Sequence, residues 1–132
     1  MSTKPNRHIH GIRTVGIPVS DQDRAVAFYR DVLGFDIQMD MPLPQVGARW
    51  IEAAPAGAPV SVALVKTDTT TPDGNETGIR FSTADAAAAH AELDAAGVAV
   101  GELLEWPGVP PMFTLRDPDG NGLTVVQQAG QQ

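Results

Sequence analysis

The apolar residues near the N-terminus follow two different periods. Val15, Ile17 and Val19 recur at every second position, which is typical of a half-buried strand. From about residue 21 to residue 33 the period lengthens to that of an amphipathic helix. Ser20 suits the N-cap of this helix, and Gly34 is suited to end it. The apolar stripe of the predicted helix consists of Ala25, Phe28, Tyr29 and Val32.

Three further strands follow the predicted helix, at residues 35–41, 48–54 and 60–66. A polar linker, residues 67–76, then separates this pattern from a second copy of it. Ile79, Phe81 and Thr83 match Val15, Ile17 and Val19 in order and at one constant offset along the chain. The sequence then predicts a second helix at 84–96 and strands at 101–106, 112–116 and 123–127.

The chain is therefore predicted to be a tandem repeat of two β-α-β-β-β modules. The modules span residues 11–66 and 77–128, with a flexible N-terminal tail at 1–10 and a C-terminal tail at 129–132. One helix per sheet leaves one sheet face bare, so we expect an α+β fold in which two curved sheets enclose a cavity and the helices lie outside. Alternation assigns the following residues to the core: Val15, Ile17, Val19, Ile79, Phe81, Leu123 and Val125. It assigns these to the cavity: Thr14, Gly16, Trp50, Glu52, Gly78, Arg80, Thr124 and Val126.

Composition narrows the class of protein. The chain has 132 residues, a formal net charge of −7 and no cysteine, which excludes disulfides, thiolate metal sites and cysteine nucleophiles. The acidic balance argues against nucleic-acid binding. No segment approaches the roughly 20 apolar residues of a membrane-spanning helix, and residues 1–6 lack the apolar centre of a signal peptide. We therefore expect a cytoplasmic protein.

A tight turn, Arg116-Asp117-Pro118-Asp119-Gly120-Asn121, is predicted to close a β-hairpin between the last two strands. Together with the segments 19–35 and 81–85, this turn resembles the vicinal oxygen chelate superfamily. That superfamily includes glyoxalase I, extradiol dioxygenases, and fosfomycin- and bleomycin-resistance proteins. The resemblance covers roughly residues 11–128. It implies paired β-α-β-β-β modules and a homodimer with cavities near the subunit interface.

The resemblance also implies where a metal site would lie. Catalytic members hold a divalent metal with two histidines and a glutamate, at positions that correspond to Thr14, Gly78 and Thr124 in this chain. These residues supply neither an imidazole nor a carboxylate. The metal-dependent chemistry of the family is therefore disfavoured, and we expect no metal and no cofactor.

Several other residues are candidates for binding or chemistry. Trp50 could stack against a ligand or serve as an ordinary core or interface tryptophan. Glu52 and Arg80 could contact a polar ligand inside the cavity or lie solvated at the sheet rim. Trp106 lies beside a proline-rich loop that could cover the cavity or only cross a sheet edge. His90 is expected to be structural.

The leading hypothesis is a metal-independent protein of the bleomycin-resistance type that sequesters a small molecule. The acidic charge, Trp50 and Glu52 are compatible with an aromatic or cationic ligand. The ligand-binding residues of this protein would be Thr14, Trp50, Glu52, Arg80, Thr124 and Val126. The alternative is a lyase, isomerase or dioxygenase-related enzyme that uses Glu52 as a base or a non-standard metal site with His8, His10 or Glu52. The expected partners are a small molecule and a second copy of the chain, with no nucleic acid and no membrane. The identity of the ligand, and whether any reaction is catalysed, stay open.

Overall fold

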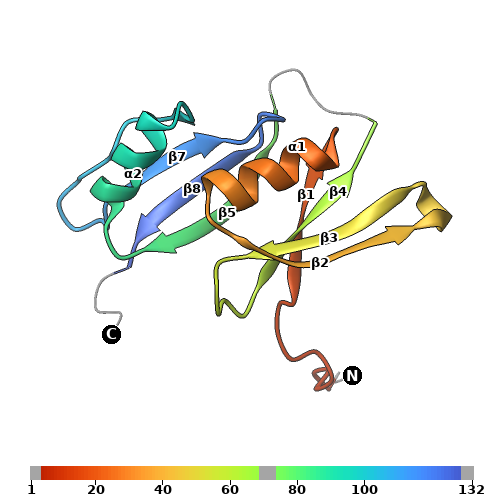
Figure 1. Ribbon diagram of the computed structural model, residues 1–132. Coiled ribbons are helices and arrows are strands. Elements are labelled where there is room, and N and C mark those ends of the chain that lie inside the picture. Colours follow the sequence, from red (N-terminus) through yellow and green to blue (C-terminus); the bar gives the residue numbers. More distant parts are fainter. Residues whose placement is uncertain (1–3, 69–73, 129–132) are drawn as a thin grey trace.

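The computed structural model describes residues 4–68 and 74–128, and it contains the two predicted modules (Figure 1). The predicted C-terminal tail, residues 129–132, lies outside the described residues, and the predicted N-terminal tail and linker lie partly outside them. The first module consists of β1 (Thr14–Val19), α1 (Gln22–Ala27), a π-helical turn η1 (Phe28–Val32), β2 (Asp36–Leu43), a short 3-10 helix η2 (Pro44–Val46), β3 (Ala48–Ala54) and β4 (Ser61–Lys66). The second consists of β5 (Glu76–Thr83), α2 (Ala86–Ala95), β6 (Ala99–Val100), β7 (Met112–Arg116) and β8 (Gly122–Gln127).

Each module forms one four-stranded sheet with the same strand order. The orders are β1-β4-β3-β2 and β5-β8-β7-β6, so the first strand of each module lies at an edge and pairs in parallel with the last. The other pairs are antiparallel. Pro18, which cannot donate a ladder hydrogen bond, lies on the edge strand β1, where such a residue is tolerated. The α+β fold with tandem β-α-β-β-β modules is confirmed.

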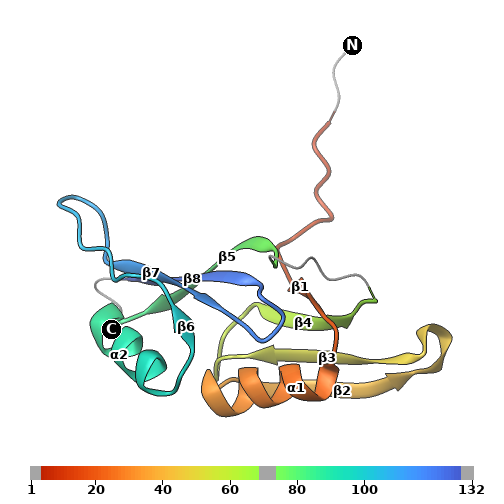
Figure 2. The same ribbon diagram turned by 90° about the horizontal axis from the view of Figure 1, so that it is seen from above.

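The two helices run along the same side of the molecule, and each covers one face of its own sheet (Figure 2). We call the opposite face of each sheet the helix-free face. A single apolar core continues through both modules beneath the helices. The rings of Phe35 and Phe81, one from each module, meet edge to face with centroids 5.3 Å apart. Of the predicted core residues, Ile17, Val19, Leu123 and Val125 are buried, whereas Val15, Ile79 and Phe81 are partly buried.

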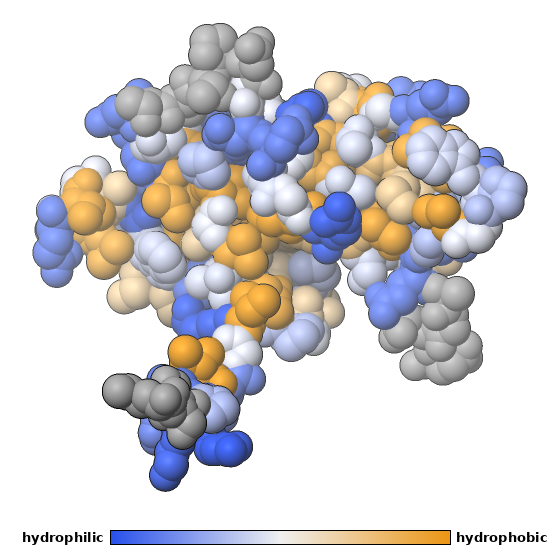
Figure 3. Space-filling view, turned by 180° about the vertical axis from the view of Figure 1, so that it is seen from behind, coloured by the Kyte–Doolittle hydropathy of each residue, from blue (hydrophilic) through white to orange (hydrophobic). Residues whose placement is uncertain are grey.

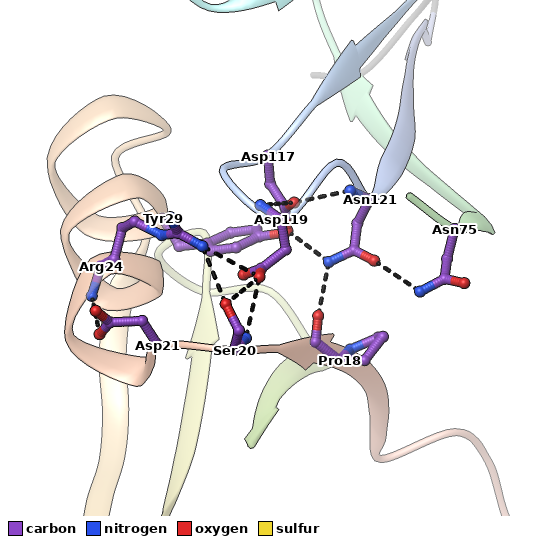
Figure 4. A network of polar contacts seen from close by, with 9 residues as sticks. All are labelled: Pro18, Ser20, Asp21, Arg24, Tyr29, Asn75, Asp117, Asp119 and Asn121. Atoms are coloured by element: carbon purple, nitrogen blue, oxygen red, sulfur yellow. Dashed lines mark hydrogen bonds and ion pairs between the residues drawn. The ribbon is translucent and has the colours of Figure 1, made fainter. Parts of the chain in front are cut away.

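The loop at residues 116–121, which we call the intermodule turn, joins the modules through polar contacts (Figure 4). Asp117 is buried and accepts hydrogen bonds from Tyr29 Oη (2.8 Å) and from Asn121 Nδ2 (2.9 Å). Asn121 Nδ2 also donates to the carbonyl of Pro18 at 2.8 Å. Asp119 Oδ1 accepts from Ser20 Oγ at 2.6 Å. A turn of the second module thus ties itself to the end of β1 and to the helical segment of the first.

The side chain of Gln22, in α1, is hydrogen-bonded to the first sheet. Gln22 is 7% exposed and its amide donates to the carbonyls of Arg49 and Leu64, at 2.7 and 2.9 Å. Its Oε1 accepts from Arg49 N at 3.1 Å. The amide therefore bridges β3 and β4 and holds the start of α1 against the sheet.

Four predicted details are wrong. The N-cap of α1 is Asp21, whose carboxylate accepts from Arg24 N, because Ser20 is bound to Asp119 instead. The switch to π geometry turns Val32 outward, leaving it 38% exposed, while Val26 is buried. Glu76 belongs to β5 rather than to the linker.

The fourth wrong detail is the strand predicted at 101–106. The regular strand before the loop is β6, which has two residues, and beyond it Leu104 makes one isolated bridge to Met112. The proline-rich segment that follows lacks the donors that a continuous ladder needs. No helix in the described part of the chain is long and apolar enough to cross a membrane.

Candidate functional site

A buried carboxylate lies on the helix-free face of the first sheet. Glu52 is 4% exposed and pairs in register with Ala63 of β4, two residues from Ser61. Because side chains alternate along a strand, Glu52 and Ser61 lie on the same face, opposite the core residues Ile51 and Val62. Thr14 pairs with Ser61 across the parallel β1–β4 ladder and joins them on that face.

Three donors converge on this carboxylate. Trp50 Nε1 and Arg13 Nη1 donate to Glu52 Oε2 at 2.7 and 2.9 Å. Ser61 Oγ lies 3.0 Å from Glu52 Oε1 and 2.9 Å from Thr14 Oγ1. We call Arg13, Thr14, Trp50, Glu52 and Ser61 the Glu52 cluster.

The electrostatics of the cluster keep Glu52 ionised. The hydrogen bond from Trp50, followed by those from Arg13 and Ser61, holds the pKa of the Glu52 carboxyl below its usual value, although desolvation acts in the opposite direction. A carboxylate with a lowered pKa is a weaker base. Its charge is also compensated by the Arg13 guanidinium, whose side chain is 69% exposed. Glu52 is therefore suited to hold its neighbours in place.

The residue that Glu52 holds in place on the surface is Trp50. Its indole is anchored to Glu52 at one edge, and its side chain is partly exposed on the helix-free face. Met41 of β2 pairs with Trp50 in register and is 48% exposed. This part of the face therefore offers a fixed aromatic surface beside a flexible apolar side chain, which is the combination that planar organic ligands use.

The other predicted site residues lie on the helix-free face of the second sheet. Arg80 pairs in register with Thr124, and Ser82 with Val126, so these side chains share a face. Thr124 and Val126 are partly buried, and Arg80 is exposed. Within the described residues, Arg80 has no carboxylate partner within ion-pair distance. The structure thus brings Thr14, Trp50 and Glu52 together on the first sheet and places Arg80, Thr124 and Val126 on the second.

A cleft of about 600 Å³ opens between the modules, and Ser61 is the one member of the Glu52 cluster that lines it. Val15, Val62, Ile79 and Phe81 contribute its apolar walls, and Arg80 and Ser61 are polar residues that line it. Ser61 belongs to both the cluster and the cleft. The volume is in the range of small-molecule sites in proteins.

Two members of the cluster, Ser61 and Arg13, were not predicted from the sequence as site residues. Ser61 opens β4, and the antiparallel pairing of β3 with β4 brings it to Glu52. Arg13 precedes β1 and approaches Glu52 across 39 positions of sequence. Alternation within β4 could have placed Ser61 on the helix-free face, whereas no local signal identifies Arg13.

The remaining candidates lie elsewhere. His8 and His10 are exposed in the segment before β1. His90 Nε2 lies 2.8 Å from the carbonyl oxygen of Gly101, and its ring packs edge to face against Phe113, which suits a structural residue. Within residues 4–68 and 74–128, no three His, Cys, Asp or Glu side chains are grouped to hold a metal ion.

Trp106 is 61% exposed at the start of a turn closed by a hydrogen bond from Val109 N to Trp106 O. The loop that carries it projects away from the helices (Figure 2).

Known proteins share both the fold and the sequence pattern. The chain superposes on TnmS3, an antibiotic binding protein from Streptomyces sp. CB03234, with a TM-score of 0.82 and 34% identity over 94% of this chain and all of that one. A glyoxalase/bleomycin resistance protein from the same strain gives a TM-score of 0.75 and 36% identity, covering 89% of this chain and 100% of the other. Uncharacterized protein YetH of Bacillus subtilis (strain 168) is 40% identical over 57 residues, which span 42% of this chain and 46% of YetH.

A family model supports the same relationship over most of the chain. Residues 11–125 match the model described as the Glyoxalase/Bleomycin resistance protein/Dioxygenase superfamily. The sequence resemblance is therefore confirmed, and this chain belongs to the glyoxalase/bleomycin resistance protein/dioxygenase superfamily.

Proposed function

We propose that this protein binds and sequesters a small organic molecule without using a metal ion, on the helix-free face around Trp50. The observation that carries the proposal is the anchored indole: Trp50 Nε1 is held 2.7 Å from Glu52 Oε2 while its side chain stays partly exposed. A fixed ring loses little conformational freedom on binding. The similarity to TnmS3, whose name states that it binds an antibiotic, supports a binding role.

The cluster also narrows the chemistry of the ligand. Glu52 has its charge compensated by Arg13, so it would attract a cation only weakly. Trp50 favours a planar aromatic body, and the exposed Arg13 guanidinium can donate to an oxygen at the edge of that body. An aromatic ligand with carbonyl, phenolate or carboxylate oxygens therefore fits better than a simple cation.

The alternative, an enzyme that uses Glu52 as its base, is disfavoured by the same contacts. Donors already occupy both carboxylate oxygens, and the lowered pKa reduces the tendency of Glu52 to accept a proton. A reaction through Glu52 would have to break these hydrogen bonds first.

We further propose that two copies assemble and that their helix-free faces enclose the ligand. The segment at residues 4–13, which we call the N-terminal arm, leaves the body on the side away from the helices (Figure 2). It exposes Ile9 and Ile12 by 79% and 69%. The side facing away from the helices also carries hydrophobic residues (Figure 3), and Met41 and Val65 are 48% and 39% exposed.

Charge supports the same assembly. The sequence up to Ser20 contains Lys4, Arg7 and Arg13 and no carboxylate side chain, so the rest of the chain is more acidic than the overall net charge of −7. A basic arm with two exposed isoleucines is complementary to the acidic body of a second copy. We expect the assembled protein to act in the cytoplasm.

Binding is tested with 1-anilinonaphthalene-8-sulfonate, an aromatic anion, as the first probe. In a Trp106→Phe protein, Trp50 is the only tryptophan, so quenching of its emission reports contact with the probe directly. We expect quenching, a raised melting temperature and recovery of the probe unchanged, with at least tenfold weaker binding in Trp50→Ala. Equal affinity of Trp50→Ala and the parent, or near-stoichiometric metal in tag-free protein, would contradict the proposal.

The assembly is tested by light scattering on the full chain and on a variant that lacks residues 1–12. We expect the mass of two chains for the first and a concentration-dependent loss of mass for the second. The mass of a single chain for the full protein at all concentrations would refute the proposed dimer.

A further inference from the structure

A second cleft, of about 700 Å³, lies between the two helical segments. One wall is the end of the first helical segment, with Val32 and Leu33, and the other is α2. Figure 1 shows this end of the first helical segment beside α2. The floor is apolar and comes from both modules; it consists of Phe35, Phe81, Leu115 and Val125. It shares Phe35, Pro55, Phe81 and Ser82 with the 600 Å³ cleft. It is separate from the proposed ligand site around Trp50, because it lies on the helix-covered side of both sheets.

The small side chains of α2 leave this cleft open. Ala88, Ala89 and Ala96 line it, and side chains of this size leave space between the two helical segments. Val32, which the π-helical turn directs outward, adds apolar surface at the edge. The cleft therefore offers an apolar body of drug-like size a place to be buried.

The charge around the cleft has one sign. Asp31, Asp85 and Glu92 line it, and the lining includes no lysine, arginine or histidine. Asp31 is paired with Arg30 at 2.8 Å, and Asp85 Oδ1 accepts from Ala88 N at 3.0 Å. Glu92 is exposed one turn further along α2 than Ala88 and is the carboxylate available to a ligand. An anion would meet like charges here, whereas a cation would meet opposite ones.

We propose that this cleft binds a hydrophobic organic cation. The apolar body of the ligand lies against Phe35 and Phe81, and its positive group lies towards Glu92. The inference goes beyond the proposed function, since it uses a cleft on the helix-covered side instead of the face around Trp50 and selects the opposite ligand charge. A ligand seated here contacts both modules at once, so its binding stabilises the folded chain by mass action.

Two probes of matched size and opposite charge test the proposal. Tetraphenylphosphonium and tetraphenylborate are titrated into the full-length protein by calorimetry, and melting temperatures are measured with each. We expect the cation to bind at least tenfold more tightly than the anion and to raise the melting temperature. The preference should decrease as salt concentration rises, because the carboxylates that attract the cation are exposed.

Charge reversal locates the site. We expect Glu92→Lys to weaken tetraphenylphosphonium binding about fivefold, as befits an exposed opposite charge replaced by a like one. Glu102→Lys is the matched control, because it changes the net charge equally from an exposed position outside the cleft. Its affinity should equal that of the parent.

Other outcomes would overturn the inference. Equal losses in Glu92→Lys and Glu102→Lys would mean that net charge alone attracts the probe. Loss of binding in Trp50→Ala but not in Glu92→Lys would place the cation on the helix-free face. A change of light-scattering mass in Glu92→Lys would show that another chain, rather than a small cation, occupies the cleft. No binding by any of the proteins would exclude a cation site directly.

Discussion

Replacing Tyr29 with phenylalanine would remove one hydroxyl group from the contacts that join the two modules. Tyr29 is fully buried, and its hydroxyl donates to Asp117 Oδ2 at 2.8 Å. In the variant, Asp117 would keep its bonds from the Asn121 side chain and from the backbone amides of Asp119 and Asn121. A hydrogen bond to a charged group contributes about 1.5–3 kcal/mol. We therefore expect the free energy of unfolding to fall by about 2 kcal/mol, and the melting temperature by about 6–10 °C for a chain of this size.

The same substitution should alter the response to alkaline pH. Burial, and then the negative charge of Asp117, raise the pKa of the Tyr29 phenol far above its ordinary value of about 10. Above pH 10 the unfolded chain releases this proton and the folded chain retains it. The stability that Tyr29 contributes is therefore complete below pH 10 and falls by about 1.4 kcal/mol per pH unit above it. The advantage of the wild type over Tyr29→Phe, about 2 kcal/mol at pH 8, should vanish near pH 11.5.

Urea unfolding of both proteins between pH 8 and pH 11.5, followed by far-ultraviolet circular dichroism, measures this difference. Groups other than Tyr29 titrate in both proteins and cancel in the comparison. Tyr29 is the only tyrosine of the chain, so the phenolate absorbance band reports it alone. We expect no phenolate in the folded protein at pH 11 and a midpoint near pH 10 in urea. A midpoint near 10 in the folded protein, or a stability difference that does not change with pH, would refute the reasoning.

Four further substitutions, one of them a control, test the contacts that shape the first module and its connection to the second. Glu52→Gln should cost about 1 kcal/mol at pH 7. Because folding lowers the pKa of Glu52, this loss of unfolding free energy should be present above about pH 4.3 and disappear as the pH falls below that value. Equal losses in urea unfolding at pH 7 and pH 3 would contradict this expectation. Gln22→Leu leaves backbone groups of β3 and β4 without partners, so thermal unfolding should show a loss of roughly 2–3 kcal/mol. Gly74→Ala should lower the melting temperature more than its control Gly78→Ala. Both glycines have positive φ, but of the two only Gly74 would bring a Cβ against the backbone, at the carbonyl oxygen of Gly120. Equal melting temperatures of the two variants would contradict this.

Much of the fold could be read from local patterns. The predicted limits of β3 and β7 agree with the structure, and the repeat of the first module's apolar pattern at one constant offset identified the second module. These features depend on alternation and helical period, which are properties of neighbouring residues. The strand predicted at 101–106 failed because pairing with β7 extends over only two residues and one isolated bridge. The apolar residues of the segment 101–106 do not indicate how many of its positions will pair with a neighbouring strand.

The candidate site was predictable to a smaller extent. Trp50 and Glu52 share a face because they lie two positions apart on one strand, and the sequence shows this directly. Their contact with Ser61 depends on the antiparallel β3–β4 pairing, and their contact with Arg13 depends on the parallel β1–β4 register, which no local pattern states. That register changes the interpretation of Glu52, from a possible base to a residue that anchors the indole of Trp50.

The sequence by itself determined the two modules, the hairpin closed by the intermodule turn and the family of the protein. Each follows from residues close together in the chain, through side-chain periodicity and turn chemistry. Only the tertiary structure decided which charges are compensated and where space remains between the modules. Those properties arise where distant segments meet, as Asp117 meets Tyr29 and Glu52 meets Arg13. Desolvation and hydrogen bonding act on a group only through the neighbours that folding provides.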